Sequence, residues 1–255
     1  MSFDVAADAY DSFMGRYSSQ LSAQMADLAG VRPGQHGVRV LDVGCGPGAL
    51  TAELVARIGP EAVAAVDPSA SFVDAARARY PRVDVRQAGA EELPFEDGAF
   101  DAVIAQLVVH FISDPVAGLA EMARVTRTGG VVAACVWDHA GGHGPLALFF
   151  AAARALDPDV ADESERAGTR EGHLAELFEA AGLRDIESTF VTASREHPTF
   201  DDWWAPYELG VGPAGAHVAS LDPAHQLELR ERARSLIRSV PFTVTAKAWA
   251  ARGVV

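Results

Sequence analysis

Lysine is nearly missing from this 255-residue chain: Lys247 is the only one, and arginine carries almost all of the positive charge. Lysine-dependent chemistry therefore has one candidate residue, and no Tyr-x-x-x-Lys pair is present to serve a hydride-transfer enzyme. Acidic residues outnumber basic ones by 35 to 21, for a net charge of -14. This charge disfavours attraction to nucleic-acid phosphates, so we expect a small-molecule partner and no nucleic acid.

Cysteine and long apolar runs are also scarce. The two cysteines, Cys45 and Cys135, both lie in apolar segments, which is typical of reduced, buried thiols. Apolar runs such as residues 131–137 are far too short to span a bilayer, and no basic stretch precedes an apolar one near the N-terminus. We expect a cytoplasmic protein without a membrane partner, present as a monomer or homodimer.

Strand and helix patterns alternate along most of the chain. Near-continuous apolar strands separated by amphipathic helices indicate a doubly wound, mostly parallel sheet covered on both faces. Two further strand patterns near the C-terminus bring the expected number of strands to seven. The expected strands are residues 38–43, 62–66, 83–87, 100–106, 131–137, 186–192 and one from Phe242 onward, and helices are expected at 50–58, 72–80, around Leu119 and around Leu174.

The remaining segments suggest three parts. Residues 1–37 carry apolar residues at helical spacing, including Tyr10 and Tyr17, and are expected to form a helical cover. Residues 38–192 with 241–255 would form the catalytic domain. Residues 193–240 are more than the sheet needs, and we interpret them as a helical lid or substrate insertion before the last strand.

Residues 40–48, Val-Leu-Asp-Val-Gly-Cys-Gly-Pro-Gly, carry the most functional information. A buried strand runs into Gly44, Gly46 and Gly48, and a helix begins at once, so the backbone can pass close beneath a nucleotide-like ligand. The loop also satisfies the dinucleotide pattern G-x-G-x-x-G/A, which keeps a nicotinamide-dependent oxidoreductase as an alternative. Asp67, at the end of the next strand, fits ribose hydroxyls in either class.

Two features of the loop favour a cationic ligand over a pyrophosphate. Asp42 is a carboxylate inside an apolar strand, where burial is costly unless donors or a cation compensate it. An ammonium or sulfonium group would supply that compensation, whereas a pyrophosphate would be repelled. Pro47 also removes an N–H that would otherwise be available to phosphate.

With these residues the chain resembles the class I S-adenosylmethionine-dependent methyltransferases, in the group similar to the ubiquinone and menaquinone biosynthesis methyltransferases (methyltransferase type 11). The resemblance rests on residues 40–48, 65–69, 89–95 with 100–103, and 124–125 with 129–130, in the family's order and spacing. One departure is Thr128, where the family usually has proline. The resemblance implies a Rossmann-like fold and S-adenosylmethionine as cofactor, with S-adenosylhomocysteine as product.

The resemblance also implies roles for individual residues. The loop would pack under the methionine part of the cofactor, with Asp42 near its amino group and Asp67 on the ribose. Arg16 could pair with the cofactor's carboxylate in bidentate fashion or be a surface arginine. The full expected cofactor set is Tyr10, Arg16, Asp42, Gly44, Cys45, Gly46, Gly48, Asp67, Pro68, Phe72, Ala90, Glu91 and Gln106.

Methyl transfer needs a general base only when the acceptor atom arrives protonated. The candidate bases are His110, His139 and His143. They follow strands at the C-terminal edge of the parallel sheet, where such folds bind ligands. Each has a structural alternative, as a hydrogen-bonded buried histidine or as part of a flexible glycine loop. We expect no metal site: the His139–His143 spacing lacks a third ligand, and the acidic residues of 157–165 are expected to be solvated.

Overall fold

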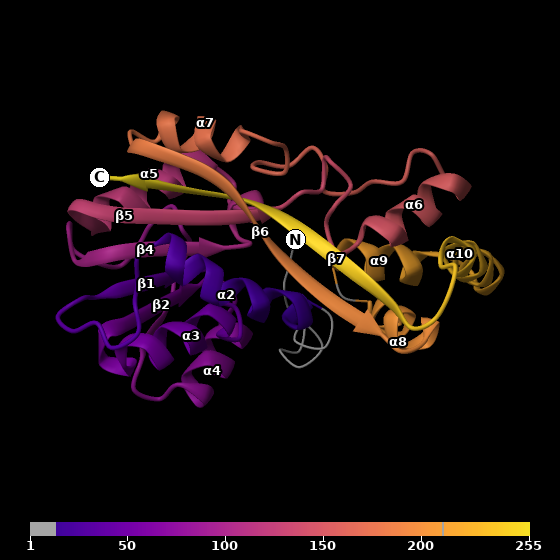
Figure 1. Ribbon diagram of the computed structural model, residues 1–255, viewed down its shortest axis with the longest axis horizontal. Helices are drawn as coiled ribbons and strands as arrows, with labels where there is room; N and C mark the ends of the chain where they lie inside the picture. The colour runs from indigo at the N-terminus through magenta and orange to yellow at the C-terminus, as the bar shows by residue number, and fades with distance from the viewer. Residues whose placement is uncertain (1–13, 211) are drawn as a thin grey trace.

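The computed structural model describes residues 14–210 and 212–255, so the predicted cofactor residue Tyr10 lies outside the described chain. Seven strands form one sheet in the order β3-β2-β1-β4-β5-β7-β6 (Figure 1). The first five strands pair in parallel, while β7 is antiparallel to both of its neighbours. The prediction of a mostly parallel, doubly wound seven-stranded sheet is confirmed. The strands are β1 (Val40–Val43), β2 (Val63–Asp67), β3 (Asp84–Gln87), β4 (Phe100–Gln106), β5 (Thr126–Trp137), β6 (Arg184–His197) and β7 (Phe242–Val254).

Helices cover both faces of this sheet. On one face Leu21, Leu54 and Val73, from α2, α3 and α4, pack in one core cluster. On the other face Leu119 and Phe178, from α5 and α7, pack in a second cluster. Figure 1 shows these two helical layers on opposite sides of the strands. The helices are α2 (Arg16–Leu28), α3 (Ala49–Ile58), α4 (Ala70–Arg79), α5 (Pro115–Val125), α6 (Ala147–Leu156), α7 (His173–Ala180), α8 (Phe200–Trp204), α9 (Gly212–Ser220) and α10 (Pro223–Leu236), with short 3-10 turns η2 (Pro60–Ala62), η3 (Val109–Phe111) and η4 (Ala205–Leu209).

Alternation along the buried strands explains why both faces are apolar. In β1, Val40 contributes to one cluster and Leu41 to the other, and every residue of the strand is buried. Successive side chains of a strand point to opposite faces, so a strand buried on both faces reads as a continuous apolar run. Asp42 is the one polar residue in β1, and its position in such a strand is the first structural sign of a ligand site.

The helix α2 is fastened to α3 by a buried arginine. Arg57 of α3 donates from Nη1 to the carbonyl oxygen of Val31 at 2.7 Å and from Nη2 to that of Ala23 at 3.0 Å. Its Nε also bonds Glu53 at 2.7 Å within α3. Because one of these backbone carbonyls lies within α2 and the other follows the helix, the N-terminal cover has a fixed position above the sheet.

A second group of helices lies beyond the far ends of β6 and β7, where α6, α8, α9 and α10 gather (Figure 1). The sequence did not predict α6, whose residues follow a glycine-rich loop. It also predicted too short a sixth strand, because β6 continues to His197 in pairing with β7 and its outward residues are polar. The division of the chain into a cover, a catalytic domain and a lid stays a proposal.

Within residues 14–210 and 212–255, no helix combines the length and the apolar character needed to cross a membrane.

Candidate functional site

The loop between β1 and α3 has the close-packed geometry that the glycine pattern predicts. Gly44 and Gly48 hold left-handed φ angles of 69° and 103°. A Cβ atom on Gly44 would lie 2.4 Å from Cγ2 of Val108, and one on Gly48 would lie 2.6 Å from the ring of Tyr80. Both the backbone conformation and the space therefore require glycine at these two positions.

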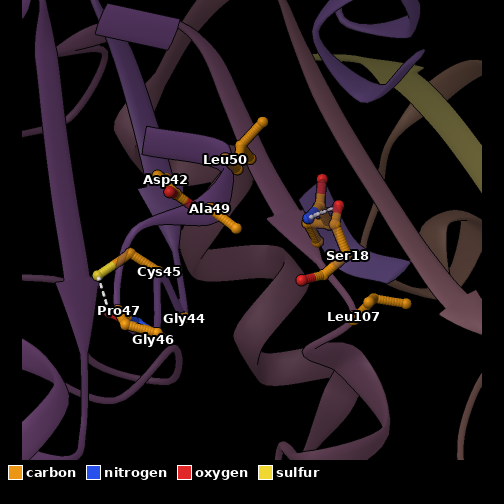
Figure 2. Close-up of a pocket in the computed structure, with 10 residues that line it drawn as sticks. Ser18, Asp42, Gly44, Cys45, Gly46, Pro47, Ala49, Leu50 and Leu107 are labelled. Carbon is orange, nitrogen blue, oxygen red and sulfur yellow. Dashed lines mark hydrogen bonds between the residues drawn. The ribbon is translucent and has the colours of Figure 1, made fainter. Parts of the chain in front are cut away.

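A cavity opens beside this loop, at the carboxyl ends of β1 and β4 (Figure 2). Its wall includes Asp42 of β1, Gln106 of β4 and Ser18 of α2. The Gln106 side chain donates from Nε2 to the Ser18 carbonyl at 3.0 Å, which joins the α2 cover to the edge of the sheet. Gly44, Cys45 and Gly46 also line this cavity, and their contact with a cofactor stays a prediction.

Two buried oxygens on the cavity wall have no donor among the described residues. Oδ2 of Asp42 accepts a hydrogen bond of 2.6 Å from the Thr51 hydroxyl, but its Oδ1 accepts none. Oε1 of Gln106 is likewise without a partner within the described chain. Buried acceptors are normally hydrogen-bonded, so this pair points to a ligand that brings N–H donors or positive charge.

The electrostatics of Asp42 point the same way. Its pKa is raised to about 7: burial is the largest cause, the Thr51 hydrogen bond opposes the rise, and the nearby Asp67 adds to it. Near neutral pH the carboxyl group is thus held between its two protonation states. A cation placed against Oδ1 would favour the charged form.

Asp67, at the end of β2, holds two turns in place. Its Oδ2 accepts from the Gly46 N–H at 2.8 Å and its Oδ1 from the Ser69 N–H at 2.9 Å. Burial raises its pKa, while these two hydrogen bonds lower it. The carboxylate therefore links the glycine loop to the start of α4, and each oxygen retains a second lone-pair direction for a hydroxyl donor.

The residues expected around adenine lie near the ends of β2 and β3. Phe72 is buried in α4 and Ala90 is buried after β3, whereas Pro68 and Glu91 are exposed. Oε1 of Glu91 accepts from the Ser113 N–H at 3.1 Å, so this side chain braces the loop before α5. Their contact with adenine stays a prediction.

Arg16 lies on a different side of α2 from the cavity beside the glycine loop, which we call the cofactor cavity after the ligand that the family resemblance implies. Its Nη1 is 3.8 Å from Oδ1 of Asp202, and it lines a second cavity, under the helices of residues 193–240. Its proposed contact with the cofactor carboxylate stays a prediction, and Tyr10 lies outside the described residues.

Two of the three predicted base residues meet in a buried cluster with Glu163. His110 lies in η3, and its ring centre is 5.9 Å from that of His139, which follows β5. Burial holds the pKa of His110 well below its usual value and lowers that of His139 to about 4, so both rings are neutral at pH 7. The expectation that the acidic residues of 157–165 are solvated is wrong for Glu163, which is 4% exposed. The fold places it beside His110 and His139, with one ligand-type atom of each residue within 4.8 Å of the others.

The third predicted base, His143, stands at the surface. Its side chain is 62% exposed, and its Nδ1 lies 2.8 Å from Oδ2 of the buried Asp138. The same carboxylate oxygen is 2.9 Å from Nζ of Lys247, the single lysine. These two partners hold the pKa of Asp138 below its usual value despite its burial.

The sequence did not identify a second polar arrangement, which joins α2 to α8. His197, at the end of β6, bonds Oδ2 of Asp202 through Nδ1 at 2.7 Å and the Tyr17 hydroxyl through Nε2 at 3.1 Å. Burial raises the pKa of Tyr17 to about 12 and lowers that of His197, although Asp202 opposes the latter shift. Tyr17 is far from His197 in sequence, so no local motif could reveal this contact.

Tyr17 and His197 line the same cavity as Arg16, which we call the lid cavity. Its other walls are mainly aromatic and apolar: Met14, Pro145, Leu146, Trp203, Pro206 and Tyr207. Tyr17 faces this cavity while its neighbour Ser18 lines the cofactor cavity, so the two spaces lie on adjoining sides of α2.

Comparison with known proteins places the chain in a family. A methyltransferase-domain family model matches residues 41–134, which contain the glycine loop, Asp67 and Gln106. A demethylmenaquinone methyltransferase of Mycobacterium sp. (strain KMS) is 38% identical over 171 residues, a match that covers 62% of this chain and 71% of the relative. Several other curated relatives are matched over only 34% to 41% of their own length.

Solved structures share the fold at low sequence identity. The YcgJ protein of Bacillus subtilis aligns with a TM-score of 0.59 at 20% identity, over 91% of this chain and 97% of that one. The [4+2]-cyclase SpnF aligns with a TM-score of 0.54 at 19% identity, over 92% and 81%. From the family model and the mycobacterial relative, the chain belongs to the S-adenosylmethionine-dependent methyltransferases, in the group similar to the menaquinone biosynthesis enzymes.

Proposed function

We propose that this protein transfers a methyl group from S-adenosylmethionine to an oxygen, nitrogen or carbon atom of a small organic acceptor, releasing S-adenosylhomocysteine. The observation that carries the proposal is a pair of buried oxygens on the wall of one cavity, Oδ1 of Asp42 and Oε1 of Gln106, that accept no hydrogen bond from residues 14–210 or 212–255. The cofactor's ammonium group supplies the N–H donors and the charge that these oxygens lack. A dinucleotide pyrophosphate supplies neither, so the nicotinamide alternative is not retained.

The remaining cofactor contacts follow from the family resemblance. Asp67 would accept hydrogen bonds from the ribose hydroxyls, and the loop at Gly44 and Gly46 would lie under the methionine part. Pro68, Phe72, Ala90 and Glu91 would surround the adenine. This assignment uses the carboxyl edge of the parallel strands, where open α/β sheets bind ligands.

When bound, S-adenosylmethionine supplies an activated methyl group, and its displacement is an in-line reaction with a neutral leaving group. The chain's own residues then have to align the acceptor and exclude water. The lid cavity suits this task because its walls are aromatic and it adjoins the cofactor cavity across α2. We assign the acceptor site to this cavity and infer an apolar or aromatic acceptor.

His197 is the group best placed to take a proton from an acceptor in that cavity. Asp202 accepts a hydrogen bond from Nδ1 at 2.7 Å, so the proton is on Nδ1 and the lone pair that can accept a proton is on Nε2. Tyr17 occupies Nε2 in this structure and would either yield to the acceptor or relay its proton. The lowered pKa of His197 keeps the imidazole in the neutral, proton-accepting form at pH 7.

Replacing His197 by glutamine is expected to lower kcat for a hydroxyl or amine acceptor about 100-fold or more, because general-base catalysis contributes that much. Binding of S-adenosylhomocysteine should stay within about threefold of wild type, since His197 lies outside the cofactor cavity. Steady-state kinetics and calorimetry measure the two effects, and His225→Gln on the exposed face of α10 is the matched control. An unchanged kcat in His197→Gln would remove this residue from the mechanism.

A second candidate function is cofactor binding without methyl transfer. It is favoured by the resemblance to SpnF, a [4+2]-cyclase with this fold, since one fold hosts several chemistries. Release of S-adenosylhomocysteine across a panel of phenols, alcohols, amines and acidic carbon compounds separates the two. Turnover with any member supports methyl transfer, whereas tight cofactor binding with no release from the whole panel supports the second candidate.

We also propose a cytoplasmic location and a monomeric or dimeric state. The support for the location is that Cys45 and Cys135 are both buried free thiols. Size-exclusion chromatography with light scattering tests the assembly, and a species larger than a dimer would contradict it.

A further inference from the structure

The cluster of His110, His139 and Glu163 contains more unsatisfied polar groups than a packed core tolerates. His110 Nδ1, His139 Nε2 and Glu163 Oε1 are all buried, and none has a hydrogen-bond partner in the part of the chain that the structure describes. A buried polar atom that is left without a partner keeps the unfavourable free energy of its desolvation. Three of them in one place indicate that something else completes the site.

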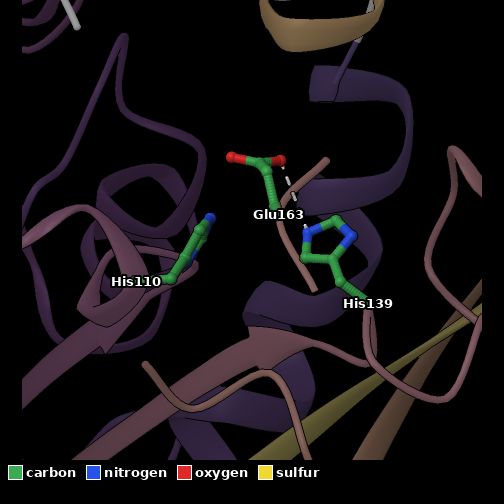
Figure 3. Close-up of side chains that lie close together, drawn as sticks. All are labelled: His110, His139 and Glu163. Atoms are coloured by element: carbon green, nitrogen blue, oxygen red, sulfur yellow. Dashed lines mark ion pairs between the residues drawn. The ribbon is translucent and has the colours of Figure 1, made fainter. Parts of the chain in front are cut away.

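The three side chains converge on a common space (Figure 3). One ligand-type atom from each residue lies within 4.8 Å of the corresponding atoms of the other two. His139 Nε2 and Glu163 Oε2 are 3.6 Å apart. Two ligands at about 2.1 Å from a tetrahedral ion lie about 3.4 Å from each other, so this pair already has nearly the required spacing.

The residues come from three loops that the sheet brings together. His110 follows β4, His139 follows β5, and Glu163 lies in the segment between α6 and α7. The ring centres of His110 and His139 are 5.9 Å apart with the ring planes tilted by 57°, and the His139 and Glu163 side chains are 8% and 6% exposed. The site is therefore built by the fold and shielded from water.

We propose that His110, His139 and Glu163 bind one divalent transition-metal ion, with at least one coordination position left for water or a substrate oxygen. Two imidazole nitrogens with one carboxylate suit Zn²⁺ and its neighbours and do not suit Mg²⁺ or Ca²⁺, which prefer all-oxygen sites. Three protein ligands with an open position are typical of catalytic rather than structural zinc sites. This site is additional to the proposed methyl transfer and does not depend on it.

Arg166 is the neighbouring cation that the site has to accommodate. Its Nε lies 3.8 Å from Glu163 Oε1, beyond hydrogen-bond distance, and its Nη1 donates to the carbonyl oxygen of His110 at 3.2 Å. The guanidinium thus lies beside two of the three ligand residues. Together with a dication it would favour an anionic oxygen in the open position.

Titration of the metal-stripped protein with Zn²⁺, and separately with Co²⁺, tests the proposal without cofactor or acceptor. The expected result is one ion bound per chain, with a Co²⁺ visible spectrum of a four- or five-coordinate site. Glu163→Gln keeps the shape of the side chain and should weaken binding at least about 100-fold, because even loss of a residue that only orients a ligand costs 10–100-fold.

The matched control is His36→Ala, which removes one exposed histidine outside the cluster and should bind Zn²⁺ like wild type. If Glu163→Gln does not fold by circular dichroism, His139→Gln takes its place with the same expectation. Wild-type protein that binds no Zn²⁺, or a ligand variant that binds it with wild-type affinity, overturns the proposal. The first result would leave the three groups as a proton relay.

Discussion

Gly44→Ala is expected to abolish measurable cofactor binding, with an affinity loss of at least about 100-fold. The new methyl group would lie 2.4 Å from Cγ2 and 2.7 Å from Cγ1 of Val108. The backbone at position 44 also has a φ of 69°, in the left-handed region that side chains other than glycine rarely adopt. Left-handed strain costs about 1–2 kcal/mol and overpacking about 1–3 kcal/mol, so the loop must move away from its cavity. Calorimetric titration with S-adenosylhomocysteine and urea unfolding measure binding and stability separately.

Gly34→Ala is the matched control for Gly44→Ala. Gly34 has nearly the same φ, 73°, but nothing lies within 4 Å of its added Cβ. It should lose only the strain energy, about 1 kcal/mol of unfolding free energy, and should bind the cofactor normally. The double variant Gly44→Ala/Val108→Ala should regain part of the binding, since both clashing methyl groups are removed. Equal effects of the two single alanine variants would contradict the close-packing argument.

Asp42→Asn is expected to weaken S-adenosylhomocysteine binding about 100-fold while making the ligand-free protein more stable at pH 8. The affinity falls because a neutral amide replaces the carboxylate that faces the ammonium group. The stability rises because the variant no longer carries a buried charge beside Asp67. Opposite effects on binding and on stability are typical of a residue kept for its ligand.

The pH dependence follows from the direction of the Asp42 shift, from 3.8 to about 7. Below pH 3.8 the group is protonated in both states, and its stabilising contribution is fully present. As the pH rises toward 7, the unfolded chain loses this proton first, so about 4 kcal/mol of unfolding free energy is lost. The stability advantage of Asp42→Asn over wild type should therefore shrink when the pH is lowered from 8 to 5. Urea unfolding at the two pH values measures it, and an advantage that does not change with pH would contradict the raised pKa.

The sequence was sufficient to predict the sheet and the tight glycine loop because both depend on local patterns. A strand buried on both faces has a continuous apolar sequence. Where such a strand meets a glycine-rich loop, the sequence marks the carboxyl end of the strand, which is where open α/β sheets bind ligands. In this way Asp42 stood out inside β1 before its environment was known. The burial of Asp42 and its donor-less Oδ1 then gave a physical reason for a cationic ligand.

The sequence was insufficient where function depends on contacts between distant segments. Residues 147–156 are almost entirely apolar, so they lack the polar face that identifies an amphipathic helix, and α6 was missed. Glu163 lies in an acidic stretch, and only the fold encloses it between His110 and His139. Likewise Tyr17 and His197 meet only when α2 packs beside the end of β6. Pairings of this kind leave no periodicity to detect.

Calorimetric titration of the wild-type protein with S-adenosylhomocysteine, and in parallel with NADH, tests the central claim most directly. We expect one S-adenosylhomocysteine site per chain, lost in Gly44→Ala, and no heat of binding with NADH. Binding of NADH instead, or binding of S-adenosylhomocysteine that neither Gly44→Ala nor Asp42→Asn weakens, would contradict it.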